Sequence, residues 1–424
     1  MRPDGPRQVA PPGMHRLRAM AIALLVVAVS LAVAPRVGSA DSASIGRAAT
    51  ASRTPPGGPP APLRSLAIPR THFTPAITAR LTATLAQLRR VNHLLGLQVV
   101  IRYPDGTAWT GHAGFGDIAA RTPMGSLTLL DAGSITKTFV AALTLQLAGQ
   151  GVVGLDDPIA RWLPGLPYDT GITIRELLDH TSGVDDAFSH PALLAALDAN
   201  HRQVWTAPHV LAYVGKARFA PGQGFSYSNS NYILVGQLIE RATGQTLAAL
   251  LRQRFFAPLH LTHTYLQSEE PISGSPAHGY EFTSPTTWAV KDLSDGTPHL
   301  PFTSLETSLG AAGALVTTAD DLARWALYLY RGKVLPPAQL SQMLDFGLTA
   351  ALNPVLPYGL GVERRSFDGR GSWGHAGSLS GFRSAIRYFP ASGGVTIAVM
   401  TNSDRVDPDT LVGSLLEVLY PLSP

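Results

Sequence analysis

Gly133-Ser134-Ile135-Thr136-Lys137 is the stretch of sequence on which the predicted fold and chemistry both depend, and an apolar helical pattern follows it. A Ser and a Lys three positions apart on a helix lie on one face, so the ammonium can reach the hydroxyl. A lysine desolvated at a helix start can have its pKa lowered enough to take the serine proton. The N–H groups at that helix start can stabilise an oxyanion. The stretch therefore predicts Ser134 as nucleophile and Lys137 as its proton partner.

A surface Lys one turn after an N-cap Ser is the simpler interpretation of this stretch, because Ser is a favoured cap. Lys137 is one of four lysines in the chain, and it is the one with a Ser three residues before it. Both residues stand at the start of an apolar helix, which favours the catalytic interpretation.

Tyr227-Ser228-Asn229 is the second candidate, between the turn residues 221–224 and a predicted helix. A phenol beside an ammonium can hold its anion below the usual pKa of about 10. We therefore expect Tyr227 to act as a base toward the serine and then as an acid toward the leaving group. Asn229 can donate to a substrate carbonyl and accept from the lysine. The alternative is a Tyr that packs at a helix entrance.

His375-Ala376-Gly377 is the third candidate, in a predicted strand-edge segment that continues into Ser378. Its glycine lets a substrate backbone lie close to the strand. The same tripeptide occurs at residues 112–114, in a predicted outer strand that precedes the Ser-x-x-Lys stretch. We assign the earlier copy a structural role.

Ser-x-x-Lys, then Tyr-x-Asn about 90 residues later, then His-x-Gly about 150 residues after that, resemble the three-motif pattern of serine penicillin-recognising enzymes. The variant is similar to the group that holds class C β-lactamases, D-alanyl-D-alanine carboxypeptidases and related esterases and aminopeptidases. Residues 177–183, 311–322 and 358–361 also agree with this group. We interpret those segments as architectural, and His180 within the first of them as a residue that fixes a turn.

The resemblance implies a role for each residue of the three motifs. Ser134 is the acylated nucleophile, Lys137 its proton partner, Tyr227 the acid/base and Asn229 a ligand of the substrate amide. His375 and Gly377 line the substrate strand, and the backbone N–H groups of Ser134 and Ser378 form the oxyanion hole.

Two departures from the family pattern bear on the substrate. Many β-lactamases have Lys where this chain has His375, and Thr is common where it has Ala376. A fixed positive charge for a substrate carboxylate is therefore missing, since an imidazole is mostly neutral at pH 7. We expect neutral esters and amides to be turned over at least as readily as penicillins, and β-lactam hydrolysis to be slow or absent. Arg383 is the alternative group for a carboxylate.

Helical and strand patterns predict the fold class, α/β of the α+β kind. Strands at both ends of the body predict one antiparallel sheet with flanking terminal helices and an inserted, mainly helical domain, the β-lactamase/transpeptidase-like architecture. The predicted helices are 75–95, 134–149, 173–179, 204–216, 232–243, 246–256, one after 317, and 409–420; the predicted strands are 97–103, 107–114, 358–365, 371–374, 384–389 and 394–401.

The N-terminal residues predict export. Arg16 and Arg18 precede the apolar residues 19–34, and small residues end at Ala40, which is typical of a signal peptide over residues 1–40. The start is Met1 or Met14. An uncleaved membrane anchor is the alternative, although the apolar run is shorter than the ~20 residues that a span prefers. We therefore expect a secreted or periplasmic, cell-envelope protein.

The rest of the chain divides into a spacer and a catalytic body. Residues 41–70 are rich in Ser, Ala, Pro and Gly, which predicts a flexible spacer. A catalytic domain over 71–424 follows, with sheet parts at about 71–130 and 300–424 and a helical part at about 131–299.

Composition narrows the partners and the chemistry. The net charge of +4 comes from arginines scattered without runs, which disfavours nucleic acid as a partner. The chain has no Cys, so disulfides and thiolate nucleophiles are excluded. It contains neither a His-Glu-x-x-His pattern nor a Gly-x-Ser-x-Gly elbow. We therefore expect no metal and no cofactor. We expect contact with a membrane only if the N-terminal segment stays uncleaved.

The first functional hypothesis is a serine hydrolase that acts on peptidoglycan-stem acyl substrates, in the manner of a D-alanyl-D-alanine carboxypeptidase, or on small esters or amides. The alternatives are a class C-like β-lactamase and a non-catalytic, ligand-binding member of the same fold. Four polar groups predicted to converge, from Ser134, Lys137, Tyr227 and Asn229, favour the enzyme.

Overall fold

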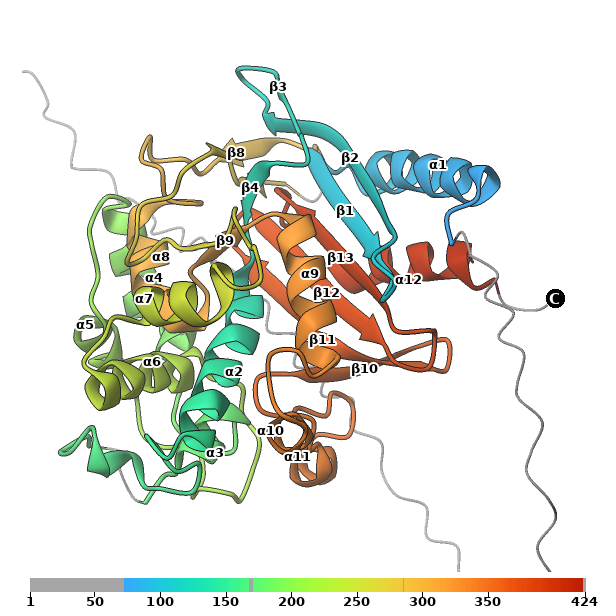
Figure 1. Cartoon of the computed structure of the whole chain (residues 1–424). Coiled ribbons are helices and arrows are strands. Elements are labelled where there is room, and N and C mark those ends of the chain that lie inside the picture. The colour runs from blue at the N-terminus through green and yellow to red at the C-terminus, as the bar shows by residue number, and fades with distance from the viewer. Residues whose placement is uncertain (1–71, 168–170, 285, 422–424) are drawn as a thin grey trace, which may run out of the picture. The chain divides into compact units, whose positions relative to one another are not determined.

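Strands from both ends of the body form the main sheet (Figure 1). The computed structural model describes residues 72–167, 171–284 and 286–421. Within them the strand order is β10-β11-β12-β13-β1-β2-β3, with antiparallel neighbours throughout. The bounds are β1 Gly96–Arg102, β2 Ala108–Asp117, β3 Thr122–Pro123, β10 Glu363–Phe367, β11 Arg370–Leu379, β12 Phe382–Phe389 and β13 Val395–Thr401.

Helices cover both faces of this sheet because its central strands are apolar on both sides. The terminal helices α1 (Pro75–Val91) and α12 (Pro408–Leu419) pack on one face, and α9 (Ala319–Tyr330) packs on the other (Figure 1). Successive residues of β1 show the division. Val99 lies in the core with α1 and α12, and Val100 lies in the core that continues into the helical part.

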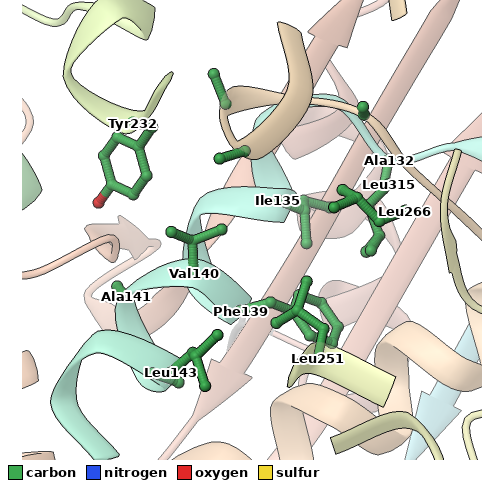
Figure 2. Packing of buried hydrophobic residues seen from close by; sticks show 14 of the residues in the cluster. Ala132, Ile135, Phe139, Val140, Ala141, Leu143, Tyr232, Leu251, Leu266 and Leu315 are labelled. Carbon is green, nitrogen blue, oxygen red and sulfur yellow. The ribbon is translucent and has the colours of Figure 1, made fainter. Parts of the chain in front are cut away.

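The helical part fills the chain between β4 and β5, where the described residues form no other strand. Its helices are α2 Thr136–Gly149, α3 Ile174–Leu178, α4 Pro191–Ala199, α5 Ala207–Leu211, α6 Asn229–Thr243 and α7 Leu247–Leu251. One core of buried side chains runs from the sheet into these helices, and Figure 2 shows Ile135 and Phe139 within it. Both residues are fully buried, so the start of α2 is anchored by apolar packing.

Shorter elements complete the described structure. β4 (Thr128–Asp131) leads into α2 and pairs with β9 (Leu315–Thr317) in a four-stranded sheet of order β5-β9-β4-β6. The remaining elements are β5 Tyr265–Leu266, β6 Ser275–Pro276, β7 Tyr280–Phe282, β8 Val290–Asp292, α8 Thr303–Leu309, α10 Pro337–Met343 and α11 Gly347–Leu352. Across the described ranges, every helix is too short or too polar to traverse a bilayer.

The predicted fold class is confirmed, while several predicted boundaries are wrong. The helix predicted over 204–216 is limited to α5, and the strand predicted to begin at Tyr358 begins at Glu363. Gly361, with φ of 74°, turns the chain between these two residues. The strand predicted over 371–374 extends to Leu379 and therefore includes the whole His-Ala-Gly segment.

The signal peptide predicted over residues 1–40 and the spacer predicted over 41–70 lie outside the described residues. The earlier His-Ala-Gly copy lies in β2, which the main sheet separates from β11 by three strands. His112 is exposed there, in keeping with the structural role assigned to it.

Candidate active site

Ser134 lies at the junction of two elements, in a single 3-10 turn (Gly133–Ile135) between β4 and α2 that we call the Ser134 turn. It is half-buried, and it is not the N-cap of either helical segment, since Ala132 precedes the turn and Ile135 precedes α2. The turn packs directly against β11. A Cβ added to Gly133 would lie 3.1 Å from the backbone nitrogen of Ser378 and 3.3 Å from Cα of Gly377. The Ser134 turn and the 377–378 edge thus meet at one point.

Lys137 is fully buried, and its ammonium has three partners. Nζ donates to Oγ of Ser134 at 3.0 Å, to Oδ1 of Asn229 at 2.9 Å and to the Ala312 carbonyl at 2.6 Å. Burial lowers the pKa of Lys137 from 10.5 to about 7, against the opposing effect of Asp186 and Glu363. Both the charged and the neutral form are therefore populated near pH 7.

Tyr227 is half-buried just before α6, with its ring centroid 4.9 Å from Nζ of Lys137. Burial raises the pKa of Tyr227 well above 10, although a hydrogen bond with Ser134 opposes the shift. The expectation of a lowered pKa is therefore wrong: desolvation of the phenol, helped by the carboxylates of Glu363 and Asp186, outweighs the hydrogen bond with Ser134. Tyr227 is a phenol at neutral pH, so it is placed to give a proton, and Lys137 is the stronger candidate base.

Asn229 occupies the first position of α6 and joins two charged groups. Its Oδ1 accepts from Lys137, and its Nδ2 donates to Oδ2 of Asp186 at 3.1 Å. Burial raises the pKa of Asp186, although Lys137 opposes the shift. The side chain of Asn229 lies between this carboxyl and the ammonium of Lys137.

His180 holds the backbone on both sides of Tyr227. Its carbonyl accepts from N–H of Ser226 at 3.1 Å, and its Nδ1 accepts from N–H of Ser228 at 3.2 Å. Its ring centroid is 4.2 Å from that of Tyr227. Burial, with help from Lys137 and His375, lowers the pKa of His180 well below 6.5, so the ring stays neutral and Nδ1 stays an acceptor. This agrees with a residue that fixes a turn.

His375 lies in β11 with its side chain 1% exposed, so the imidazole does not itself face the open strand edge. Its Nδ1 contacts the Ala376 carbonyl at 2.5 Å, and its Nε2 lies 2.8 Å from the hydroxyl of Tyr358. A proton on Nδ1 lets Tyr358 donate to Nε2. Burial lowers the pKa of His375 to about 4, although Glu363 raises it, so the imidazole is neutral at pH 7.

The edge of β11 becomes free where β10 stops, since the last pair of the two strands is Glu363 with Gly374. Beyond it, N–H of Ala376 donates to Oε2 of Glu363 at 3.2 Å. Gly377 cannot carry a side chain, because a Cβ there would lie 2.1 Å from the Ala132 carbonyl. Arg383 is turned onto its own chain, with Nη1 donating to the carbonyls of Leu379 and Phe382.

Sequence reasoning missed four residues of this site: Asp186, Ala312, Tyr358 and Glu363. Ala312 and Tyr358 were in segments interpreted as architectural, yet one accepts from Lys137 and the other contacts His375. Ala312 acts through its carbonyl, so its side chain carries no signal. Glu363 begins β10, the edge strand of the sheet, but its cation Arg387 comes from β12, and no sequence pattern links the two.

Comparison with known proteins gives this geometry a family. The family model described as "Beta-lactamase" matches residues 81–419. Penicillin-binding protein 4* of Bacillus subtilis is 27% identical over 65% of this chain and 61% of its own length. A D-aminopeptidase of Brucella ovis is 29% identical over 72% of this chain and 54% of its own length. The chain thus spans between half and two thirds of these relatives.

Solved structures agree with the fold. A D-stereospecific amidohydrolase from Streptomyces sp. has a TM-score of 0.70 and 27% identity, covering 83% of this chain and 100% of its own. A D-amino acid amidase from Ochrobactrum anthropi SV3 has a TM-score of 0.69 and 24% identity, covering 81% and 98%. With the family model spanning most of the described body, the chain belongs to the β-lactamase family of serine hydrolases.

Proposed function

We propose that this chain hydrolyses amide or ester bonds through an acyl-enzyme on Ser134. The observation that carries the proposal is the set of three acceptors around Nζ of Lys137. Two of them, the carbonyl oxygens of Asn229 and Ala312, can accept but never donate. When Lys137 loses a proton, its two remaining N–H groups stay with these oxygens. Its lone pair then faces the hydroxyl of Ser134, as a general base requires.

In the proposed reaction Oγ of Ser134 attacks the substrate carbonyl carbon while its proton moves to Lys137. The backbone N–H groups of Ser134 and Ser378 hold the oxyanion. The bond to the leaving group then breaks, and the leaving nitrogen or oxygen takes a proton from Tyr227, which Lys137 replaces. A water molecule then attacks the acyl-enzyme while Lys137 takes its proton. The bond between the acyl carbon and Oγ of Ser134 breaks, Lys137 returns the proton to Oγ, and the acid is released.

Asn229, Gly377 and the free β11 edge are the proposed substrate contacts. An extended substrate backbone can lie along the edge beyond Gly374, where β10 no longer pairs with β11. Asn229 is shared between Lys137 and Asp186 in the free protein, so substrate binding there would compete with the Asp186 contact.

Substrates without a free carboxylate fit this site best. His375 is neutral, and Nη1 of Arg383 donates to two backbone carbonyls of its own hairpin, so neither side chain offers a free ammonium-like group of the kind that clamps a carboxylate. This favours an amidase, aminopeptidase or esterase over a carboxypeptidase or a β-lactamase. The names of the relatives, a D-aminopeptidase and a D-stereospecific amidohydrolase, favour acyl groups of D-amino acids.

The test is turnover of matched substrates by the purified protein. We expect D-alanine p-nitroanilide to be cleaved faster than its L-enantiomer, p-nitrophenyl acetate to be cleaved, and a fluorescent penicillin to be turned over slowly if at all. Ser134→Ala should abolish all acyl transfer, whereas Ser126→Ala, at an exposed serine, should not. An acyl adduct on a residue other than Ser134, found by mass spectrometry, would refute the mechanism. Stable binding with no turnover of any substrate would instead favour a ligand-binding protein.

We also propose that the protein is exported and acts on small-molecule or peptidoglycan-stem acyl substrates. The support is the apolar run over 19–34 with the small residues up to Ala40. Such a location would give the enzyme access to peptides that contain D-amino acids.

A further inference from the structure

Two buried carboxyl groups lie beneath the Ser134 turn, outside the reaction proposed above. Asp131 ends β4, two residues before Gly133, and Glu306 lies in α8, far away in sequence. Asp131 is 1% exposed and Glu306 is 0% exposed. A fully buried acid needs either a cation or a proton of its own.

Hydrogen bonds link both carboxyls to one amide and to the turn. Oδ1 of Asp131 accepts from N–H of Gly133 at 2.6 Å. Nε2 of Gln267 lies 3.0 Å from Oδ2 of Asp131 and 2.6 Å from Oε2 of Glu306. The amide is fixed in this orientation because its oxygen accepts from N–H of Leu300 at 2.9 Å. The Leu300 carbonyl lies 2.9 Å from the same Nε2, so two carboxyl oxygens and one carbonyl compete for its two hydrogens.

The described residues supply no lysine, arginine or histidine contact to this pair, as the polar contacts given above come from amides and from the two acids themselves. Two carboxylates this close in a buried place cannot both be ionised. Asp131 accepts from N–H of Gly133 and is contacted by Nε2 of Gln267, which favours its charged form, whereas Oε1 of Glu306 is buried and accepts no N–H bond. Glu306 is therefore the member that keeps the proton, and burial together with Asp131 raises its pKa well above 4.5.

We propose that Glu306 is a positioning residue for the nucleophile: as a protonated acid it donates to Asp131, and Asp131 in turn holds the Gly133 backbone that carries Ser134. The inference rests on the proposed function in one respect, which is that Ser134 reacts. The chain of contacts runs from α8 through Asp131 to the turn that faces the β11 edge. A shift of that turn of a fraction of an ångström would misplace Oγ relative to Lys137 and to the oxyanion donors.

The proton on Glu306 also makes the free energy of unfolding depend on pH. In the unfolded chain Glu306 loses its proton near the usual value of 4.5, while the folded protein retains it to a higher pH. Between those two values the folded state binds more protons, so this group makes stability fall as pH rises and has no further effect above the folded pKa. Gln at position 306 keeps an N–H donor for Asp131 and carries no titrating proton.

The experiment compares wild type with Glu306→Gln, Glu306→Ala and the control Glu417→Gln, at an exposed glutamate of α12. Urea unfolding at pH 5 and pH 8 is the first measurement. We expect Glu306→Gln to gain stability relative to wild type as pH rises, and Glu417→Gln to show no such trend. If the stability difference between Glu306→Gln and wild type is the same at both pH values, the proposal that Glu306 keeps a proton in the folded state is wrong.

The second measurement is the rate of acylation by the substrate that wild type uses. We expect Glu306→Gln to stay within about threefold of wild type, and Glu306→Ala to lose about tenfold or more in kcat with little change in KM. Equal losses in the Gln and Ala variants, or none in either, would overturn the positioning role. Unfolding does not depend on catalysis, so an inactive wild type would count against the proposed function while the urea measurement still decides the shared proton.

Discussion

Lys137 makes the reaction depend on pH at the scale of a single residue. Burial lowers its pKa to about 7, and the proposed base is the neutral form. Because this form is lost as pH falls, kcat/KM for an uncharged amide or ester should rise about tenfold per pH unit below about pH 7 and level off above it. The measurement is a pH–rate profile of wild type from pH 5 to 9. A profile that falls with pH across 6–8 would exclude neutral Lys137 as the base.

A site contact could be predicted from the sequence where the spacing of two residues along one helix brings their side chains together. Ser134 and Lys137 stand one helical turn apart, so their 3.0 Å hydrogen bond follows from helix geometry once the helix is assigned. Tyr227 and Asn229 were identified by motif, but the raised pKa of Tyr227 was not predictable, because desolvation depends on side chains brought from other elements. For the same reason His375 was expected to face substrate and is buried.

At the scale of elements, a buried ion cluster joins β10, β12 and α12 behind the third motif. Arg387 is fully buried and donates to Asp409 from Nε and Nη2, both at 2.7 Å, and to Glu363 from Nη2 at 2.6 Å. Burial alone would raise the pKa of Glu363, but the neighbouring His375 and Arg387 outweigh it and lower that pKa to about 2. Glu363 in turn accepts from N–H of Ala376, so the cluster supports the strand edge proposed to bind substrate.

Arg387→Met should therefore cost far more than the loss of one surface ion pair. It removes the fully buried cation of the cluster and leaves the two carboxyls with Arg365, whose side chain is 37% exposed and lies 3.0 Å from Asp409. Breaking a buried ion pair typically costs roughly 3–5 kcal/mol in the free energy of unfolding, so we expect a loss toward that range. The matched control is Arg161→Met, whose side chain is 63% exposed and pairs with Asp157; such pairs contribute about 0–1 kcal/mol. Urea unfolding of both variants is the measurement. Equal small losses would show that the cluster adds nothing to stability.

The elements that sequence patterns predicted best are those with a continuous apolar face. The helix that follows Ser134, the two N-terminal strands and the final helix were each placed to within a few residues. The short segments failed, because their structure is imposed by tertiary contacts. The two-residue strands β5 and β6 pair with β9 and β4, and no periodicity can be read from two residues.

At the scale of the whole molecule, the pairing of β1 with β13 joins strands from opposite ends of the body into one sheet. This was predictable because strand patterns occur before the helical part and again after it, and a buried apolar strand needs neighbours on both sides. The exact order of strands was not predicted, since an antiparallel pattern alone does not choose between neighbours. It is the β1–β13 pairing that lets α1 and α12 share one face and pack on each other.

The last prediction concerns the residues before this body. The described core on the α1 face begins with residues of α1 such as Leu81 and Leu85, and the hydrogen bonds described at the site join residues from Asp131 onward. We therefore expect a chain that begins at Thr71 to match a chain that begins at Asp41 in kcat/KM and in melting temperature. When the whole chain is expressed in a bacterial host, we expect the exported form to begin at Asp41, because the small residues that end at Ala40 fit a signal-peptidase site.

N-terminal sequencing of the exported material and activity assays on both forms decide the matter. Intact Met1 or Met14 in a cytoplasmic fraction would rule out export, and intact N-terminal residues in the membrane fraction would identify an anchor instead. If the chain from Thr71 equals the chain from Asp41 in activity but melts at a lower temperature, residues 41–70 contribute to stability. The reverse result, equal melting with lower activity, would place part of the substrate site in those residues, and the site built from Asp131 to Arg387 would then be incomplete.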